Sequence, residues 1–302
     1  MSTVALFVDV LGPVVLLVAI GAIAGPRLGI SPASLSPLAY WVLGPAFVFD
    51  LFAADGVEAG TVGRLAVAGL AGMAAAITVA AVGNRLIGSS PSITSASVIT
   101  SGYGNVGNAG LAMTVFALGD EALAAAGVLM LVINIAGITF GVGVASRHEA
   151  GLGGAIGRAL VTPMTLAAAL AIAINLLDLD TPVVVERSAG LLAGALIPVM
   201  LFTLGLQLAI TGRPRLSADI GITAVAKLAV APLAATGVAF LLGLNDTLLG
   251  AVAIQSAMPP AVFTLVLAME HDLEPDRVTA ALVTVTVASL VTIPIVLLLT
   301  QP

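Results

Sequence analysis

Two adjacent prolines in the middle of a long apolar run are the feature that most constrains how this chain can fold. The run extends roughly from Thr247 to Met269, and its centre has the sequence Gln255-Ser-Ala-Met-Pro-Pro-Ala-Val262. Proline lacks a backbone donor and its ring clashes with the preceding turn, so a helix breaks here. Hydrocarbon tolerates a broken helix only where the freed backbone groups are buried in protein or line a wet cavity. The sequence therefore predicts a discontinuous transmembrane helix.

The composition of the chain is that of an all-α membrane protein. Hydrophobic residues make up 60% and charged residues only 9%, with a mean hydropathy of +1.19. The first apolar run starts at Val4 with no basic region before it, so we expect a permanent span rather than a signal peptide. The chain has no cysteine, which excludes disulfides and thiolate metal sites, and we expect neither a metal nor a cofactor. Its net charge of −6 argues against binding nucleic acid.

Ten transmembrane helices are predicted, because about 20 apolar residues are enough to cross a bilayer. They lie at about 4–25, 35–54, 63–86, 93–118, 122–146, 155–177, 188–210, 217–242, 247–269 and 276–300. The connections after odd-numbered spans carry seven arginines: Arg27, Arg85, Arg147, Arg158, Arg213, Arg215 and Arg277. The opposite side carries Arg64 and Arg187. Because cytoplasmic loops are enriched in basic residues, this bias predicts a multi-pass protein of the cell membrane with both termini outside the cytoplasm.

The two halves of the chain share features at a nearly constant offset. Pro45 and Pro198 are 153 positions apart, and Asn105 and Pro259 are 154 apart. Gly12-Pro13 opens the first half, as Thr162-Pro163 opens the second. The sequence thus predicts a five-helix repeat over residues 1–150 and another over 151–302, and since five is odd, the second is inverted. Inverted repeats with paired broken helices, and substrate held between them, are typical of secondary transporters.

The fourth predicted span contains a second candidate break, in Ser101-Gly-Tyr-Gly-Asn-Val-Gly-Asn-Ala-Gly110. If helices 4 and 9 both break and cross, their half-helix N-termini carry partial positive charge toward the crossing. A carboxylate is the natural occupant of such a place. The predicted binding residues are Asn105, Gly107, Asn108, Gln255, Pro259, Pro260 and Val262. The alternative is that Gly107 and Gly110 only allow close helix packing.

Two charged residues inside predicted spans are candidates for a role in charge or ion coupling. Lys227 lies near the middle of the eighth span, where a charge is costly. It could attract an anion or carry a proton, or it could have a structural partner within the bundle. Asp50 lies close to the end of the second span, where it is either an interfacial residue or part of a coupling-ion site. Asn134 is expected to make a packing hydrogen bond, although it could reach the site.

At these residues the chain resembles the auxin efflux carrier family, which includes bacterial and archaeal members. The resemblance covers essentially the whole chain and is strongest from the ninth span onward. There it is carried by Gln255-Ser-Ala-Met-Pro259, Glu270-His271, Pro275-Asp276 and Pro294. Asn105-x-Gly107-x-x-Gly110 matches the other crossover, and Pro45 and Pro232 match the proline-bearing ends of spans two and eight.

The resemblance implies a scaffold of spans 1, 2, 6 and 7, and a mobile transport domain of spans 3–5 and 8–10. It further implies a homodimer through the scaffold, an elevator-like movement, and a substrate carboxylate held by Asn105, Gln255 and the break at Pro259. One position departs from the family, which usually has a proline where this chain has Ala112. The first break is therefore expected to depend on glycines. The family's long loop between spans five and six is also reduced here to about residues 147–154.

The leading hypothesis is a carrier that exports small organic anions through a lipid membrane. A sodium- or proton-coupled symporter similar to the bile-acid symporters is the alternative, and sodium-dependent uptake would distinguish it. A zinc protease would need His-Glu-x-x-His, which the sequence lacks, and an aspartyl protease would need a membrane-embedded partner for Asp50, whereas Asp120 lies in a loop. We therefore expect no enzymatic activity. A channel or a sensor stays open, because broken helices also build pores.

Overall fold

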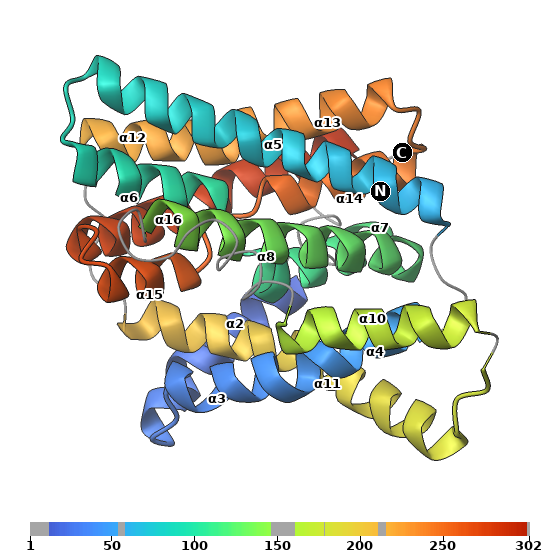
Figure 1. Cartoon of the computed structure of the whole chain (residues 1–302). Helices are drawn as coiled ribbons and strands as arrows, with labels where there is room; N and C mark the ends of the chain where they lie inside the picture. Colours follow the sequence, from blue (N-terminus) through green and yellow to red (C-terminus); the bar gives the residue numbers. More distant parts are fainter. Residues whose placement is uncertain (1–11, 54–57, 146–160, 178, 211–215, 301–302) are drawn as a thin grey trace.

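The computed structural model describes residues 12–53, 58–145, 161–177, 179–210 and 216–300. Apart from one isolated bridge between two extended residues, the regular structure of these residues is helical (Figure 1). The helices form two layers that meet along a cavity. Arg147, Arg158, Arg213 and Arg215, which support the predicted orientation, lie outside the described residues, so that orientation stays a prediction.

The smaller layer, at the bottom of Figure 1, is held together by close backbone contacts between helices. In it α11 packs on α2 and α4, and α10 packs on α4. An added Cβ at Gly21 of α2 would collide with the carbonyl oxygen of Phe202, and one at Gly205 of α11 with that of Val18. Small residues allow this close approach in membranes. The elements are α2 (Gly12–Arg27), α3 (Pro32–Leu38), the π turn η2 (Ala39–Leu43), α4 (Gly44–Ala53), α10 (Pro163–Leu176) and α11 (Val183–Ile210).

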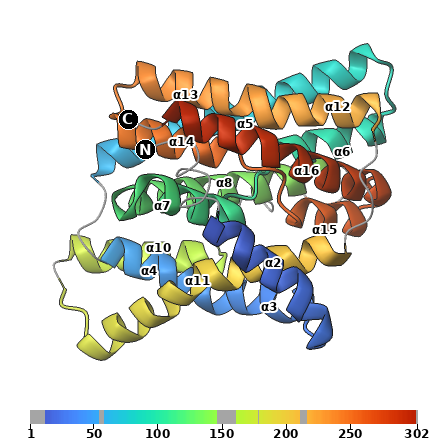
Figure 2. The same ribbon diagram turned by 180° about the vertical axis from the view of Figure 1, so that it is seen from behind.

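The larger layer contains the long helix α5, which packs on α6, α8 and α13, and the helix α16, which packs on α12 and α14 (Figures 1 and 2). Its first elements are α5 (Ala59–Leu86), α6 (Pro91–Gly102), the π turn η3 (Val106–Leu111), α7 (Ala112–Leu118), the 3-10 turn η4 (Asp120–Ala122) and α8 (Leu123–Ala145). The others are α12 (Ala218–Val225), the π turn η5 (Ala226–Val230), α13 (Ala231–Leu241), α14 (Asp246–Ser256), α15 (Phe263–Glu270) and α16 (Pro275–Thr300).

Local sequence signals explain where the two helices that precede the breaks begin. The Ser90 hydroxyl accepts a hydrogen bond from the backbone N–H of Ile93, and Pro91 occupies the first helical position of α6. The Asn245 side chain caps α14 in the same manner, accepting from the N–H of Leu248 at 3.0 Å. Both caps satisfy a backbone donor that has no partner within the helix.

The outer surface of the described residues suits a lipid environment. Six helical stretches there are long and apolar enough to span a membrane: Pro32–Ala53, Ala59–Leu86, Asp120–Gly141, Val183–Ala209, Ala218–Leu241 and Pro275–Thr300. Large apolar side chains such as Leu191, Leu233 and Phe240 are more than two thirds exposed. This confirms an all-helical membrane protein. Helix occupies part of each of the ten predicted stretches, while ten membrane crossings and the inverted repeat stay predictions.

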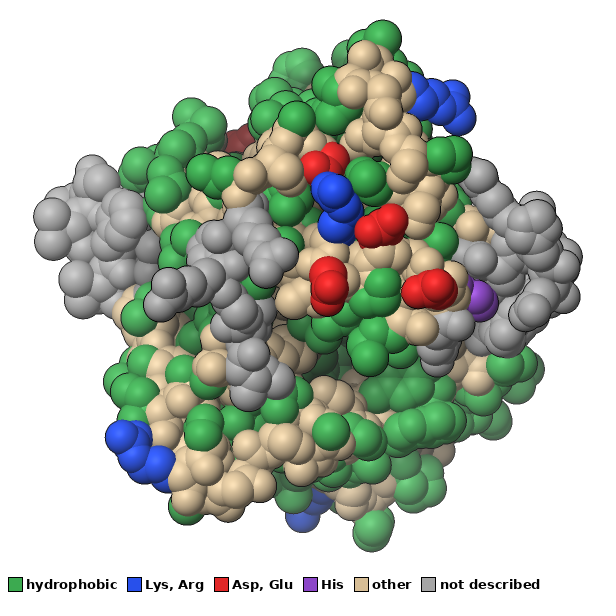
Figure 3. All heavy atoms as spheres, turned by 90° about the vertical axis from the view of Figure 1, so that its left-hand side faces the viewer, with side chains coloured by type: hydrophobic (Ala, Val, Ile, Leu, Met, Phe, Trp, Pro, Cys, Tyr) green, Lys and Arg blue, Asp and Glu red, His purple; other side chains and the backbone are tan. Residues whose placement is uncertain are grey.

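Charged side chains gather at one end of the molecule, where α12 and α16 begin (Figure 3). In α16, Arg277 donates from Nη1 to the Asp219 carboxylate of α12 at 3.1 Å, and its Nε lies 3.8 Å from Glu274. A hydrogen-bonded series of side chains continues from there into the layer, joining Thr223, Ser97 and Asn84. These contacts fasten α5, α6, α12 and α16 to one another.

Candidate functional site

Both predicted breaks are present, and the two broken helices cross. Helix α6 ends at Gly102 and helical structure resumes at Val106, while α14 ends at Ser256 and α15 begins at Phe263. The intervening segments pair in an antiparallel bridge between Gly104 and Pro260. The N–H of Asn105 donates to the carbonyl of Pro259 at 2.7 Å, and that of Ala261 donates to the carbonyl of Tyr103 at 2.9 Å. Each break thus supplies partners for backbone groups freed by the other.

The first break contains one of the four glycines of its segment and precedes two others. Its non-helical residues are Tyr103, Gly104 and Asn105, and Ala112 continues a helix that has already resumed. Gly107 and Gly110 lie within the π turn η3, where an added Cβ at Gly110 would collide with the Gln255 side chain. Gly110 therefore does allow close packing, whereas Gly104 belongs to the break itself.

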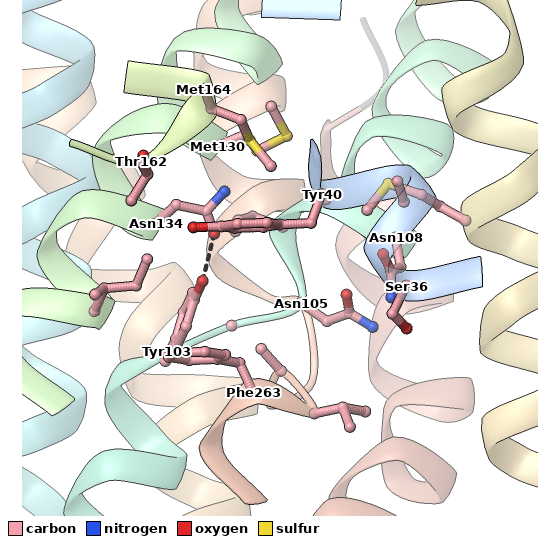
Figure 4. Close-up of a pocket in the computed structure, with 18 of the residues that line it drawn as sticks. Ser36, Tyr40, Tyr103, Asn105, Asn108, Met130, Asn134, Thr162, Met164 and Phe263 are labelled. Atoms are coloured by element: carbon pink, nitrogen blue, oxygen red, sulfur yellow. Dashed lines mark hydrogen bonds between the residues drawn. The ribbon is translucent and has the colours of Figure 1, made fainter. Parts of the chain in front are cut away.

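A cavity of about 250 Å³ lies in front of the crossover, between the two layers (Figure 4). Four of the predicted binding residues line it, namely Asn105, Gly107, Asn108 and Val262. Pro259 and Pro260 instead hold the backbone pairing beneath it, and Gln255 lies behind the crossover, where it lines a different, smaller void. The polar side chains of the cavity come from both layers: Ser36, Tyr40, Tyr103, Asn105, Asn108, Asn134, Thr162, Thr203 and Gln207.

A hydrogen-bonded aromatic cluster forms one wall of the cavity. The Tyr103 hydroxyl donates to Oδ1 of Asn134 at 2.6 Å, and the ring of Tyr103 meets that of Phe263 edge-on, with centroids 5.8 Å apart. In Figure 4 the Tyr40 hydroxyl also points toward Asn134 from the other layer. Asn134 thus makes the expected packing hydrogen bond and also borders the site. The one sequence signal for this wall is the presence of polar side chains within apolar spans.

Helix ends of opposite polarity lie on the two sides of the crossover. Helical segments η3 and α15 begin beside the cavity, so their helix dipoles give that side partial positive charge. On the other side, α14 ends at Ser256, whose carbonyl oxygen lies 3.4 Å from Nζ of Lys227. Lys227 is buried, as its position in the eighth predicted span led us to expect. The cavity is therefore suited to an anion.

The other predicted charge candidate lies away from this site. Asp50 is on α4, beside the backbone of Gly190 in α11, and is not among the residues that line the cavity. A role for Asp50 in ion coupling stays a prediction. Among the described residues, no group of three or more histidine, aspartate or glutamate side chains lies close enough to hold a metal ion.

The known proteins that are similar to this chain are described as membrane transport proteins. A protein of Methanothermobacter thermautotrophicus described as an "uncharacterized transporter" is 30% identical over 138 residues, 46% of this chain and 45% of the relative. A "putative malonate transporter" of Rhizobium meliloti is 27% identical over 203 residues, 63% of this chain and 62% of the relative. The matched regions thus span less than two thirds of either relative. Residues 152–297, just under half of this chain, match the membrane transport protein family.

Proposed function

We propose that this protein is a secondary carrier of small organic anions, with the substrate carboxylate held at the crossover of the two broken helices. The observation that carries the proposal is the crossover itself. Its paired backbone closes one side of a cavity on which two helix N-termini and the amides of Asn105 and Asn108 converge. Helix N-termini bind carboxylates and phosphates through free N–H groups and the helix dipole.

The size of the cavity favours a small acid. A volume of about 250 Å³ is just below the range of roughly 300–1,000 Å³ usual for pockets that take drug-sized ligands. Short dicarboxylates such as malonate and malate are therefore our first candidates. The description of the Rhizobium meliloti relative supports malonate as the first acid to test.

Transport in this proposal involves movement of one helical layer relative to the other. In this proposal the ten spans form two inverted five-helix repeats, α2, α3–α4, α10 and α11 form a scaffold that dimerises, and the remaining helices carry the site past it. The cavity lies between the layers, so displacement of one layer along the other would expose the substrate to alternate sides. Export across the cell membrane, with both termini outside, completes the proposal.

Transport by the purified protein in liposomes tests the proposal. Uptake of radiolabelled malonate, malate and indole-3-acetate is measured under defined gradients of protons and sodium, with and without a membrane potential. We expect saturable uptake of at least one acid, and a loss of at least tenfold in kcat/KM for Asn105→Ala and Asn108→Ala.

The matched control is Asn175→Ala, which removes an amide that donates to the carbonyl of Phe52 within the smaller layer. Its KM should equal that of the wild type. If neither cavity variant changes KM or kcat, the crossover is not the substrate site. If no acid moves under any gradient, the carrier hypothesis fails, and uptake that requires sodium would favour the symporter instead.

A further inference from the structure

We infer that Lys227 is the built-in counter-charge of the anion cavity, acting across Gly104, so that an anion binds there without a co-bound metal cation. This inference rests on the proposed function, because it concerns the same cavity. Lys227 is the only lysine of the chain, its side chain is 4% exposed, and it does not line the cavity itself.

Gly104 lies between the Lys227 ammonium and the cavity. Gly104 lines the cavity in front, and a Cβ added to it would lie 2.7 Å from Nζ of Lys227 and 3.0 Å from Cε. A side chain at this position would therefore displace the ammonium. As the structure stands, a single glycine backbone separates the Lys227 charge from the cavity.

Among the described residues, no carboxylate forms an ion pair with Lys227. Lys227 lies in the π turn η5, which packs on α5, α6, α12, α13 and α16. Across the described residues of these helices, the structure brings no Asp or Glu oxygen within 4.0 Å of Nζ, and Asp219 of α12 is engaged by Arg277. The contact that the structure does give Nζ is the carbonyl of Ser256, at the negative end of α14. Exposed carbonyls of a broken helix are the groups that hold a cation in other secondary carriers, and here the ammonium occupies that place.

A purely structural role would make Lys227 a cap for the end of α14 with no effect on what the cavity binds. The two roles differ in one measurable respect, the dependence of binding on ligand charge. Unit charges separated by a layer of backbone, in surroundings with an effective dielectric near 20, interact strongly enough to change affinity about tenfold per charge, equivalent to about 1.4 kcal/mol. A cap would affect ligands of every charge alike.

The experiment measures equilibrium binding of three probes of similar shape to the full-length protein in detergent. The probes are malonate, monomethyl malonate and dimethyl malonate, which carry two, one and no negative charges, and the buffer contains choline in place of sodium. We expect the wild type to prefer malonate. Lys227→Gln keeps a hydrogen-bond donor but loses the charge. This variant should lower the affinity for malonate about a hundredfold, that for the monoester about tenfold and that for the diester less than twofold. Lys227→Arg, which keeps the charge, should retain the order of preference.

A second readout uses the wild type and needs no variant to fold. Because the chain has one lysine, protein labelled with ¹³C-lysine contributes a single lysine side-chain Cε signal in a nuclear magnetic resonance spectrum. We expect malonate to shift that signal and dimethyl malonate at the same concentration to leave it in place.

Each result decides between the possibilities. Equal weakening of all three probes by Lys227→Gln, or a Cε signal that does not move while malonate binds, would overturn the counter-charge and leave a structural cap. Malonate binding by the wild type that requires sodium would overturn the claim that no metal cation is needed. A wild type that binds none of the three probes would refute the proposed malonate-like substrate and this inference with it, whereas binding of malonate that is unchanged in Lys227→Gln would refute only the inference.

Discussion

Replacing Gln255 by methionine should make the protein more stable and less active. The Gln255 side chain is 1% exposed, and neither its Oε1 nor its Nε2 has a hydrogen-bond partner among the described residues. Its amide lies against Gly110 and borders a void of about 10 Å³ that Lys227 also lines. Methionine has a similar length and volume, so the change removes the unpaired polar atoms with little repacking.

The size of the effect follows from the cost of burying an unpaired polar group, about 1–3 kcal/mol. Removing that cost should raise the free energy of unfolding by about the same amount, which for a chain of this size corresponds to a melting temperature higher by several degrees. Transport should fall at least tenfold, because an amide kept unpaired beside the crossover is expected to find its partner only during substrate binding or the conformational change. Thermal unfolding in detergent and uptake into liposomes measure the two effects.

Thr292→Val in α16 is the matched control. The Thr292 hydroxyl is also buried without a partner among the described residues, but Thr292 does not line the cavity. Its replacement should stabilise the protein and leave transport unchanged. A lower melting temperature for Gln255→Met would show that the amide is satisfied in the folded protein. Full transport by that variant would show that Gln255 has no part in the site, contrary to both the prediction and the family resemblance.

Two further predictions concern packing and a buried network. Gly205→Ala should lower the free energy of unfolding by about 1–3 kcal/mol, because the added methyl group collides with backbone of α2. Gly194→Ala, on the same helix with no atom within 4 Å of the added Cβ, should instead be neutral or stabilising by up to about 1 kcal/mol. Asn84→Leu should lower the free energy of unfolding by about 1–3 kcal/mol, because Asn84 is fully buried and its Nδ2 donates to Ser97 at 2.9 Å. Thermal unfolding measures all three variants. Equal melting temperatures for the two glycine variants would contradict the close α2–α11 contact, and an unchanged one for Asn84→Leu would mean that the network adds no stability.

The positions of the helices were largely predictable from the apolar runs. The predicted spans 63–86 and 276–300 correspond to α5 (Ala59–Leu86) and α16 (Pro275–Thr300). The seventh predicted span began at 188, whereas α11 begins at Val183, because Glu186 and Arg187 lie on an exposed helix end where their charges are not buried. The proline pair correctly located the second break, since proline acts locally on the backbone.

The walls of the cavity were much less predictable. Tyr40 and Thr162 reach the site from the smaller layer, far in sequence from Asn105, and no local pattern encodes that contact. Gln255 was expected to bind substrate directly, yet it lies behind the crossover, because the chain turns between Ser256 and Phe263. The nearness of Lys227 to Gly104 likewise depends on how η5 packs, which the sequence does not reveal.

The π turn η5 allows the two halves of one span, α12 and α13, to pack against different neighbouring helices. An α-helix advances 100° per residue, and a π turn accommodates one additional residue, so the helical phase after Val230 is offset by about that angle from the phase before Ala226. Helix α12 accordingly packs mainly on α6 and α16, whereas α13 packs mainly on α5 and α14. Deleting a single residue between 226 and 230 would return the span to one uninterrupted register. It would thereby turn either the α12 contacts or the α13 contacts toward lipid, a larger disturbance than any single substitution in the same turn.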